Sequence, residues 1–212
     1  MEWSRQRRMM VERQLRARGI HDERVLAAML EIPREEFIPQ REHGEAYSDE
    51  PVSIGYGQTI SQPYMTALMV QCLEITATDQ VLEVGAGCGY HAAVLGALAA
   101  RVIAVELIPE LAEMARENLR RTGRARNITV ITGDGSLGYP KEAPYHAISV
   151  AAAAADIPPA LLDQLTDPGR LAIPVGPYWE QELRVLRKEA GRIDWRVAAY
   201  CRFVPLREPA LD

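Results

Sequence analysis

The stretch VLEVGAGCGY, residues 81–90, decides the fold of this 212-residue chain. An apolar segment typical of a buried strand runs into three glycines at alternate positions, and a helical pattern starts directly after them. Glycines let the backbone turn sharply and approach a ligand closely, in front of the N-terminus of the next helix. A dinucleotide fingerprint, G-x-G-x-x-G, would need glycine at position 90, where this chain has Tyr90. The loop therefore suits a ligand without phosphate groups.

Short apolar segments alternate with helical patterns around this loop. Strands are expected at 81–84, 102–106, 128–132, 146–150 and 171–175, and helices over 90–99, 109–121 and 156–165, the last one opened by Asp156. This alternation predicts an α/β fold of the Rossmann-like, doubly wound type, with a mostly parallel sheet and helices on both faces. Two further strand patterns, LRVLRK and WRVAAYCRF, are separated by EAGR and predict a C-terminal β-hairpin.

Residues 1–50 have the pattern of a helical extension. Gly19 is expected to end a first helix, Asp22 to cap a second one, and Pro33 to stop it. Six arginines lie between residues 5 and 18, and they suggest either a polyanion-binding helix or a solvated basic face. The solvated face is the interpretation that we prefer, because charged helix faces usually point to water.

Composition limits the class of protein. Apolar residues make up 48% and charged residues 25%, which excludes a disordered or collagen-like chain. The net charge of −5 argues against a dedicated nucleic-acid binder. No apolar run approaches the roughly 20 residues that span a bilayer, and the first residues lack the apolar part of a secretory signal. Three scattered cysteines form neither a disulfide framework nor a zinc pattern. We therefore expect a soluble cytoplasmic protein without nucleic-acid or membrane partners.

Two acidic residues follow the neighbouring predicted strands. Glu106 closes the second strand, where a carboxylate can accept hydrogen bonds from ribose hydroxyls, and Asp134 lies in the GDG that follows the third. Taken singly, Glu106 is equally well explained as a helix-capping acid, and Asp134 as a turn residue beside Gly135. Three strand ends that converge at one topological switch point favour a ligand site.

This arrangement resembles the class I S-adenosylmethionine-dependent methyltransferases. The resemblance implies S-adenosylmethionine as cofactor, S-adenosylhomocysteine as product and no metal. The cofactor-binding residues that it implies are Glu83, Gly85, Gly87, Glu106, Asp134 and Gly135.

Motifs outside the cofactor region make the resemblance more specific. The segment IGYGQTISQPYM, 54–65, is similar to the signature of protein-L-isoaspartate O-methyltransferases, in which the serine at the position of Ser61 is the active-site residue. Further matches are GDGSLGY at 133–139, followed by APY at 143–145, and RFVPL at 202–206. From the residues alone, Ser61 also fits the N-cap of the following helix. The resemblance covers nearly the whole chain.

The family implies methyl transfer to the free α-carboxylate of L-isoaspartyl residues in damaged proteins or peptides, which starts their repair. Ser61 and Thr59 would orient the carboxylate by hydrogen bonding, without a nucleophile or an acid–base pair. Arg202, Val204 and Pro205 would line the channel for the peptide. A plain edge strand that ends at Pro205 is the alternative for that last segment.

The chain departs from the family pattern at several positions. His146 replaces an Asp or Asn, and we expect it to lie at a strand start, away from the reaction. Ala86 and Cys88 replace Thr and Ser in the glycine loop, while Ala151 and Ala155 stand where Thr and Pro are frequent. Lost hydroxyls at 86, 88 and 151 are expected to weaken cofactor affinity, since one hydrogen bond contributes about 1 kcal/mol.

Other functions stay open at this point. The chain could methylate another carboxylate or a small molecule, or it could hold the cofactor without turning it over. A nicotinamide-dependent oxidoreductase is disfavoured by Tyr90.

We expect residues 1–212 to form a single methyltransferase domain that acts as a monomer. Its parts would be a helical N-terminal extension (1–50), an active-site loop and helix that bind substrate (51–75), a cofactor-binding core (76–176) and C-terminal strands (177–212).

Overall fold

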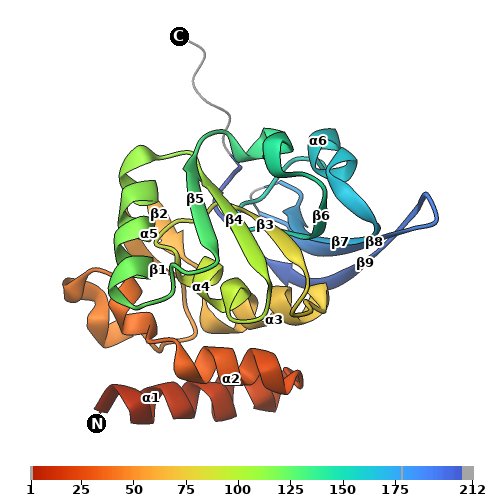
Figure 1. Ribbon diagram of the computed structural model, residues 1–212. Helices are drawn as coiled ribbons and strands as arrows, with labels where there is room; N and C mark the ends of the chain where they lie inside the picture. The colour runs from red at the N-terminus through yellow and green to blue at the C-terminus, as the bar shows by residue number, and fades with distance from the viewer. Residues whose placement is uncertain (1, 178, 207–212) are drawn as a thin grey trace.

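The computed structural model describes residues 2–177 and 179–206. A seven-stranded sheet with the order β5-β4-β3-β6-β7-β8-β9 forms its centre (Figure 1). The strands are β3 (Gln80–Val84), β4 (Arg101–Glu106), β5 (Ile128–Thr132), β6 (Tyr145–Val150), β7 (Leu165–Val175), β8 (Gln181–Glu189) and β9 (Arg192–Cys201). The strands β3 to β7 pair in parallel, and β8 and β9 add as an antiparallel ribbon. The chain order reverses between β3 and β6, which confirms the doubly wound prediction and places the switch point beside the glycine loop.

Both faces of the parallel strands are buried. Val81 of β3 points into one apolar cluster and Leu82, the next residue, into the other. The first cluster also holds buried side chains of α3 (Pro63–Leu73), α4 (Tyr90–Gly96) and α5 (Pro109–Arg121). The second holds Leu161 of α6 (Pro159–Asp163). Helices therefore cover both faces, which is why these strands are continuous apolar runs in the sequence.

The short helix α6 corrects one expectation. It begins at Pro159 rather than at Asp156, whose carboxylate accepts the N–H of its own neighbour, Ile157, at 2.8 Å. Ile157 and Pro158 each precede a proline, and such residues avoid the helical conformation. Pro158 is accordingly extended, with ψ at 124°.

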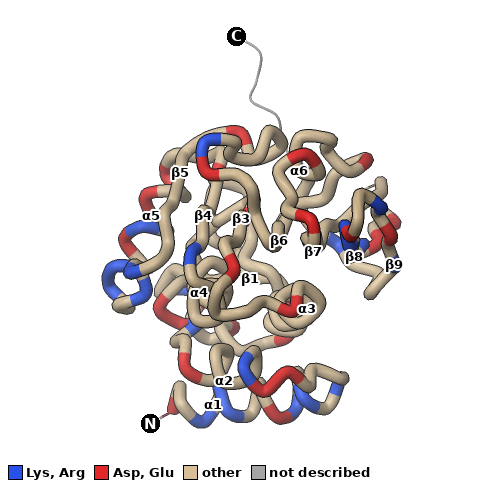
Figure 2. Tube along the Cα trace, turned by 45° about the vertical axis from the view of Figure 1, so that its right-hand side comes forward, with Lys and Arg blue, Asp and Glu red and all other residues tan. Residues whose placement is uncertain are grey.

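The N-terminal segment packs on the α3–α4 side of the sheet (Figure 1). After α1 (Glu2–Met10) the chain continues in irregular helical turns to Gly19, which has a φ of 93° and ends them as predicted. Asp22 caps α2 (Glu23–Glu31) by accepting the N–H of Arg24. Figure 2 shows basic and acidic residues interspersed along these helices, and Arg16, for example, pairs with Glu23 at 2.5 Å. That mixture supports the solvated face over a polyanion-binding stripe.

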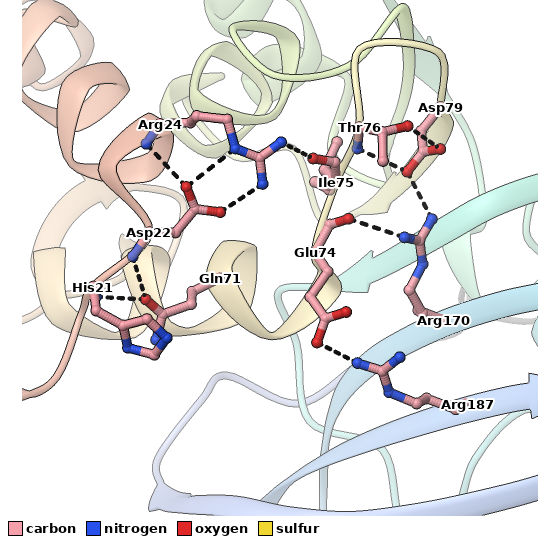
Figure 3. Close-up of polar contacts among 10 residues, drawn as sticks. All are labelled: His21, Asp22, Arg24, Gln71, Glu74, Ile75, Thr76, Asp79, Arg170 and Arg187. Carbon is pink, nitrogen blue, oxygen red and sulfur yellow. Dashed lines mark hydrogen bonds and ion pairs between the residues drawn. The ribbon is translucent and has the colours of Figure 1, made fainter.

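Polar contacts fasten this segment and the sheet to the end of α3 (Figure 3). The side-chain oxygen of Gln71 accepts the N–H groups of His21 and Asp22, at 2.7 and 2.9 Å. Arg24 donates to the carbonyl oxygen of Ile75 at 2.9 Å. From the other side, Arg170 of β7 donates to the carbonyl oxygen of Glu74 at 3.0 Å.

Two hairpins flank the core. The segment 46–65, expected only as a loop, contains β1 (Val52–Gly55) and β2 (Gln58–Ile60), which pair antiparallel. Tyr56 and Gly57 at the tip both have positive φ, at 54° and 69°, as tight hairpin turns require. The C-terminal hairpin of β8 and β9 forms as predicted. The turn between these strands is held by Asp167 of β7, which accepts the N–H groups of Ala190 and Gly191 at 2.8 and 2.6 Å.

Candidate active site

The glycine loop directs its own N–H groups inward. Gly85 and Ala86 donate to the carbonyl oxygen of Val105, at 2.8 and 3.2 Å. Gly87 donates to a carboxylate oxygen of Glu106 at 2.8 Å. A pyrophosphate would need such N–H groups free to face it, as in a phosphate-binding loop. Their internal use agrees with the prediction of a ligand without phosphates.

Glu106 ends β4 under the glycine loop and is buried. One of its oxygens accepts the N–H of Gly87, and the other accepts the N–H of Ile108, the N-cap of α5, at 3.0 Å. α5 has no side-chain cap, so Glu106 stabilises the approach to this helix without capping it. Each carboxylate oxygen can accept two hydrogen bonds, so Glu106 keeps capacity for two hydroxyls of a sugar.

Glu83 is fully buried in β3, and neither of its carboxyl oxygens has a hydrogen-bond partner within the described part of the chain. Burial and, second, the charge of Glu106 raise the pKa of Glu83 well above its ordinary value. Beside it on β6, the Ser149 hydroxyl lies 3.0 Å from Nε2 of His91. A buried carboxyl group without a partner is costly, and it marks a place where a ligand group can complete the contacts.

Asp134 and Gly135 follow β5. Asp134 caps a short 3-10 turn by accepting the N–H and the hydroxyl of Ser136, at 2.9 and 2.7 Å. Gly135 is buried, and a Cβ placed on it would lie 2.4 Å from a methyl group of Val84. Both residues thus have a structural explanation, and their contact with a cofactor stays a prediction.

A cleft opens at the glycine loop. Its lining residues are Gln58, Gly85, Gly87, Glu106, Leu107, Ile108, Leu111, Ala151, Ala152, Val204, Pro205 and Leu206. The predicted Gly85, Gly87 and Glu106 are brought together here, whereas Glu83, Asp134 and Gly135 are outside the lining. The apolar wall of Ile108 and Leu111 was not predicted from the sequence, nor was Gln58. The pair Ile108 and Pro109, which follows Leu107 and marks a helix start, could have indicated the wall. A helix that starts so soon after a strand end must border the crevice at that strand end.

A second pocket, of about 350 Å³, adjoins the cleft. It is lined by Pro51, Thr59, Ser61, Gln62, Met65, Ala151, Tyr200, Cys201, Arg202, Phe203 and Val204. We call it the acceptor pocket. Ala151 and Val204 line both spaces, so the acceptor pocket and the glycine-loop cleft meet at these two residues.

Ser61 lies between β2 and α3 in the wall of the acceptor pocket. Its interpretation as a helix N-cap is wrong, because the cap of α3 is Gln62, and Pro63, the first residue of the helix, has no N–H to satisfy. Thr59 pairs with Ser53 across the hairpin, and its side chain is exposed.

Beyond β9 the chain borders both spaces. Arg202 and Val204 line the acceptor pocket, while Pro205 lines the cleft. The carbonyl oxygen of Val204 accepts the N–H of Ala153 at 2.8 Å, so the alanine run packs against this segment. The guanidinium of Arg202 lies 5.8 Å from the ring centre of Trp179. β9 ends at Cys201, so the segment is not a plain edge strand.

The positions that depart from the family pattern divide into two groups. Ala86 and Cys88 are buried in the glycine loop, and burial raises the pKa of the Cys88 thiol to about 11. Ala151 lines both spaces. His146, in contrast, is the second residue of β6, at the opposite end of the sheet, where its Nδ1 accepts the N–H of Gln80 at 3.0 Å. This agrees with its expected structural role.

Two other classes of site find no support in the residues that the structure describes. No group of three or more His, Cys, Asp or Glu side chains among them could hold a metal ion. In the same part of the chain, every helix is too short or too polar to cross a membrane.

A model of the family described as protein-L-isoaspartate(D-aspartate) O-methyltransferase matches residues 5–210. The chain belongs to this family. A protein from Methanoculleus marisnigri named protein-L-isoaspartate O-methyltransferase is 54% identical over 202 residues, 95% of this chain and 91% of the relative. A protein of the same name from Koribacter versatilis is 54% identical over 200 residues, 94% of this chain and 90% of the relative.

Solved structures of the protein-L-isoaspartate O-methyltransferase family share the fold. One has a TM-score of 0.84 at 28% identity, over 95% of this chain and 66% of its own longer chain. Another, from Plasmodium falciparum and in complex with S-adenosyl-L-homocysteine, has a TM-score of 0.78 at 29% identity, over 93% of this chain and 96% of its own.

Proposed function

We propose that this protein transfers a methyl group from S-adenosylmethionine to the free α-carboxylate of L-isoaspartyl residues in damaged proteins. The observation that carries the proposal is the junction of the two spaces at Ala151 and Val204, where a donor in the cleft would meet an acceptor in the pocket. Membership of the family and the names of its relatives support the choice of reaction.

The glycine-loop cleft fits the cofactor. Glu106 has hydrogen-bonding capacity left for ribose hydroxyls, Ile108 and Leu111 offer an apolar wall, and the buried carboxyl group of Glu83 lies two residues before Gly85. When bound, S-adenosylmethionine supplies a methyl carbon on a positively charged sulfur, and the acceptor oxygen bonds to that carbon as its bond to sulfur breaks.

The acceptor carboxylate needs no general base from the protein. With an ordinary pKa of about 3.9, such a group is already ionised at neutral pH. In our proposal the hydroxyls of Ser61 and Thr59 hold its oxygens, and Arg202 and Val204 border the peptide main chain. Placement of reacting groups can lower a barrier by about 7–11 kcal/mol, so this chain's residues would act chiefly by orientation.

A labelling experiment tests the proposal. The purified protein is incubated with methyl-labelled S-adenosylmethionine and two matched peptides, one isoaspartyl and one normal aspartyl. We expect label on the isoaspartyl peptide alone, because the normal aspartyl peptide lacks the proposed acceptor. The label should be lost in mild base, as expected for a methyl ester. No label on either peptide, with cofactor binding shown separately, would contradict the proposal and point to another acceptor or a binding module.

We further infer that the protein acts as a monomer in the cytoplasm, on damaged proteins rather than on nucleic acids or membranes. The support for a protein substrate is the family, whose description names protein L-isoaspartate as the methyl acceptor. Light scattering combined with size exclusion at working concentration is expected to give the mass of one chain, 23.6 kDa.

A further inference from the structure

A buried arginine lies behind the acceptor pocket. Arg34 begins the 3-10 turn Arg34–Phe37 in the N-terminal segment, and its side chain is fully shielded from solvent. Nε donates to the carbonyl oxygen of Ala46 at 2.8 Å, and Nη2 donates to the carbonyl oxygen of Ser61 at 2.8 Å. The guanidinium also lies over the ring of Tyr90, 4.9 Å from its centre.

Tyr90 connects this arginine to the cofactor side of the site. It is the first residue of α4, directly after the glycine loop, and it is fully buried. One planar guanidinium therefore touches the segment that carries Ser61 and the helix that follows Gly85–Gly89. Arg34 itself lines neither the cleft nor the acceptor pocket.

The charge of Arg34 is unusual for a buried position. Among the described residues it forms no ion pair with an acidic side chain, and Nη1 has no hydrogen-bond partner. Other arginines of the segment have carboxylates, as Arg7 has Glu35 at 3.0 Å and Arg24 has Asp22 at 2.7 Å. A buried cation without a counter-charge costs stability, and an apolar side chain of similar length would fill the same space at lower cost.

An apolar side chain could not provide the fork of N–H donors that a guanidinium presents. Rigid donors spaced as in a guanidinium can hold two carbonyl oxygens from different segments in one fixed geometry, whereas a lysine offers a flexible point charge. Arg34 uses this fork on Ala46 and Ser61 while its flat face rests on Tyr90.

We propose that Arg34 is a positioning residue for methyl transfer, which fixes the position of the Ser61 main chain relative to the glycine loop. The proposal rests on the proposed function of the two spaces. Because the acceptor oxygen, the methyl carbon and the sulfur must lie in line, the distance between the two loops controls the rate. A displacement of about 1 Å can cost about 10²-fold in rate.

The test compares Arg34→Met and Arg34→Lys with the wild type. Turnover is measured with an isoaspartyl peptide and expressed per binding site for S-adenosylhomocysteine, counted by calorimetry, so that unfolded molecules are not included. We expect kcat to fall about 100-fold in Arg34→Met and at least about tenfold in Arg34→Lys, because lysine keeps the charge but loses the fork. KM for the peptide and Kd for S-adenosylhomocysteine should stay within about threefold, since no side chain that lines either space is replaced.

Arg24→Met is the matched control. Arg24 also ties the N-terminal segment to the core, through the carbonyl oxygen of Ile75, but away from both spaces (Figure 3). Its kcat per binding site should equal that of the wild type. In Arg34→Ala, guanidinium ion at low millimolar concentration should restore part of kcat without adding binding sites, whereas Arg24→Ala should not respond.

Two outcomes would overturn the proposal. One is a kcat per binding site within about threefold of the wild type in Arg34→Met. The other is a loss of activity that merely parallels a loss of binding sites in every Arg34 variant, which would show a role in folding alone. If the wild type itself left the isoaspartyl peptide unlabelled, the proposed function would fail instead, and the two failures are thereby separated.

Discussion

At the scale of single residues, we propose complementary roles for Ser61 and Arg34, because Ser61 lines the acceptor pocket and the buried guanidinium of Arg34 donates to its carbonyl oxygen. Ser61→Ala is expected to cut kcat by well over tenfold, since a hydrogen bond to a charged group contributes about 1.5–3 kcal/mol. Kd for S-adenosylhomocysteine should hardly change, because Ser61 is outside the cleft. Ser53→Ala, in the β1–β2 hairpin that precedes Ser61 but outside both linings, is the control, and turnover of Ser61→Ala near that of Ser53→Ala would refute the role.

His91 makes stability depend on pH. Burial lowers the pKa of His91 to about 4, below the ordinary value of 6.5, so between these values the unfolded chain binds a proton that the folded chain does not. The contribution of His91 to stability is therefore complete above pH 6.5 and is lost as the pH falls toward 4. Glu83 has the opposite sign, because its raised pKa costs stability as the pH rises. Comparison with His91→Gln isolates the histidine: urea unfolding should show the wild type losing about 2 kcal/mol more than the variant between pH 7.5 and 5. Equal losses would contradict the prediction.

At the scale of elements, the glycine loop depends on backbone conformations that only glycine adopts without strain. Gly87 has a φ of 53°, and a Cβ on it would meet Ile54 of β1 at 3.2 Å. Gly87→Ala should therefore shift the loop against the β1–β2 hairpin, weaken binding of S-adenosylhomocysteine about tenfold and lower stability by about 1–2 kcal/mol. Gly44→Ala is the control, because nothing lies within 4 Å of a Cβ there and its φ is not positive. Calorimetric Kd values that agree for both variants would show that the loop tolerates a side chain.

The sequence predicts elements well where one signal dominates. The helix 109–121 and the strand 128–132 have the predicted bounds, because a proline or an apolar run marks each. The β1–β2 hairpin was missed because its strands are short and rich in polar residues, and their pairing appears only in three dimensions. In the site, Gly85, Gly87 and Glu106 could be predicted because parallel strand ends converge. Arg34 could not, since segments distant along the chain bring it to the site, and Gln58 was expected in the active-site loop but not in the cofactor cleft.

At the scale of the whole molecule, one apolar cluster extends from Met10 in α1 to Phe203 after β9. Trp3 is packed against this cluster, whereas Trp195 lies far along the chain on β9 with its ring against Arg184. A shared core predicts a single cooperative transition, because the N-terminal helices cannot keep their packing once the sheet is lost.

Two variants that each keep one tryptophan test this coupling. With Trp3 or Trp195 as the only tryptophan, fluorescence should report the same urea midpoint, and that midpoint should agree with circular dichroism. An earlier transition at Trp3 would mean that residues 1–50 unfold as a separate unit, contrary to the prediction of one domain. The coupling also bears on the reaction, because Arg34 reaches Ser61 from within those first 50 residues. Unfolding of the N-terminal segment should therefore abolish methyl transfer. Activity should be lost at the urea concentration at which the fluorescence of Trp3 changes.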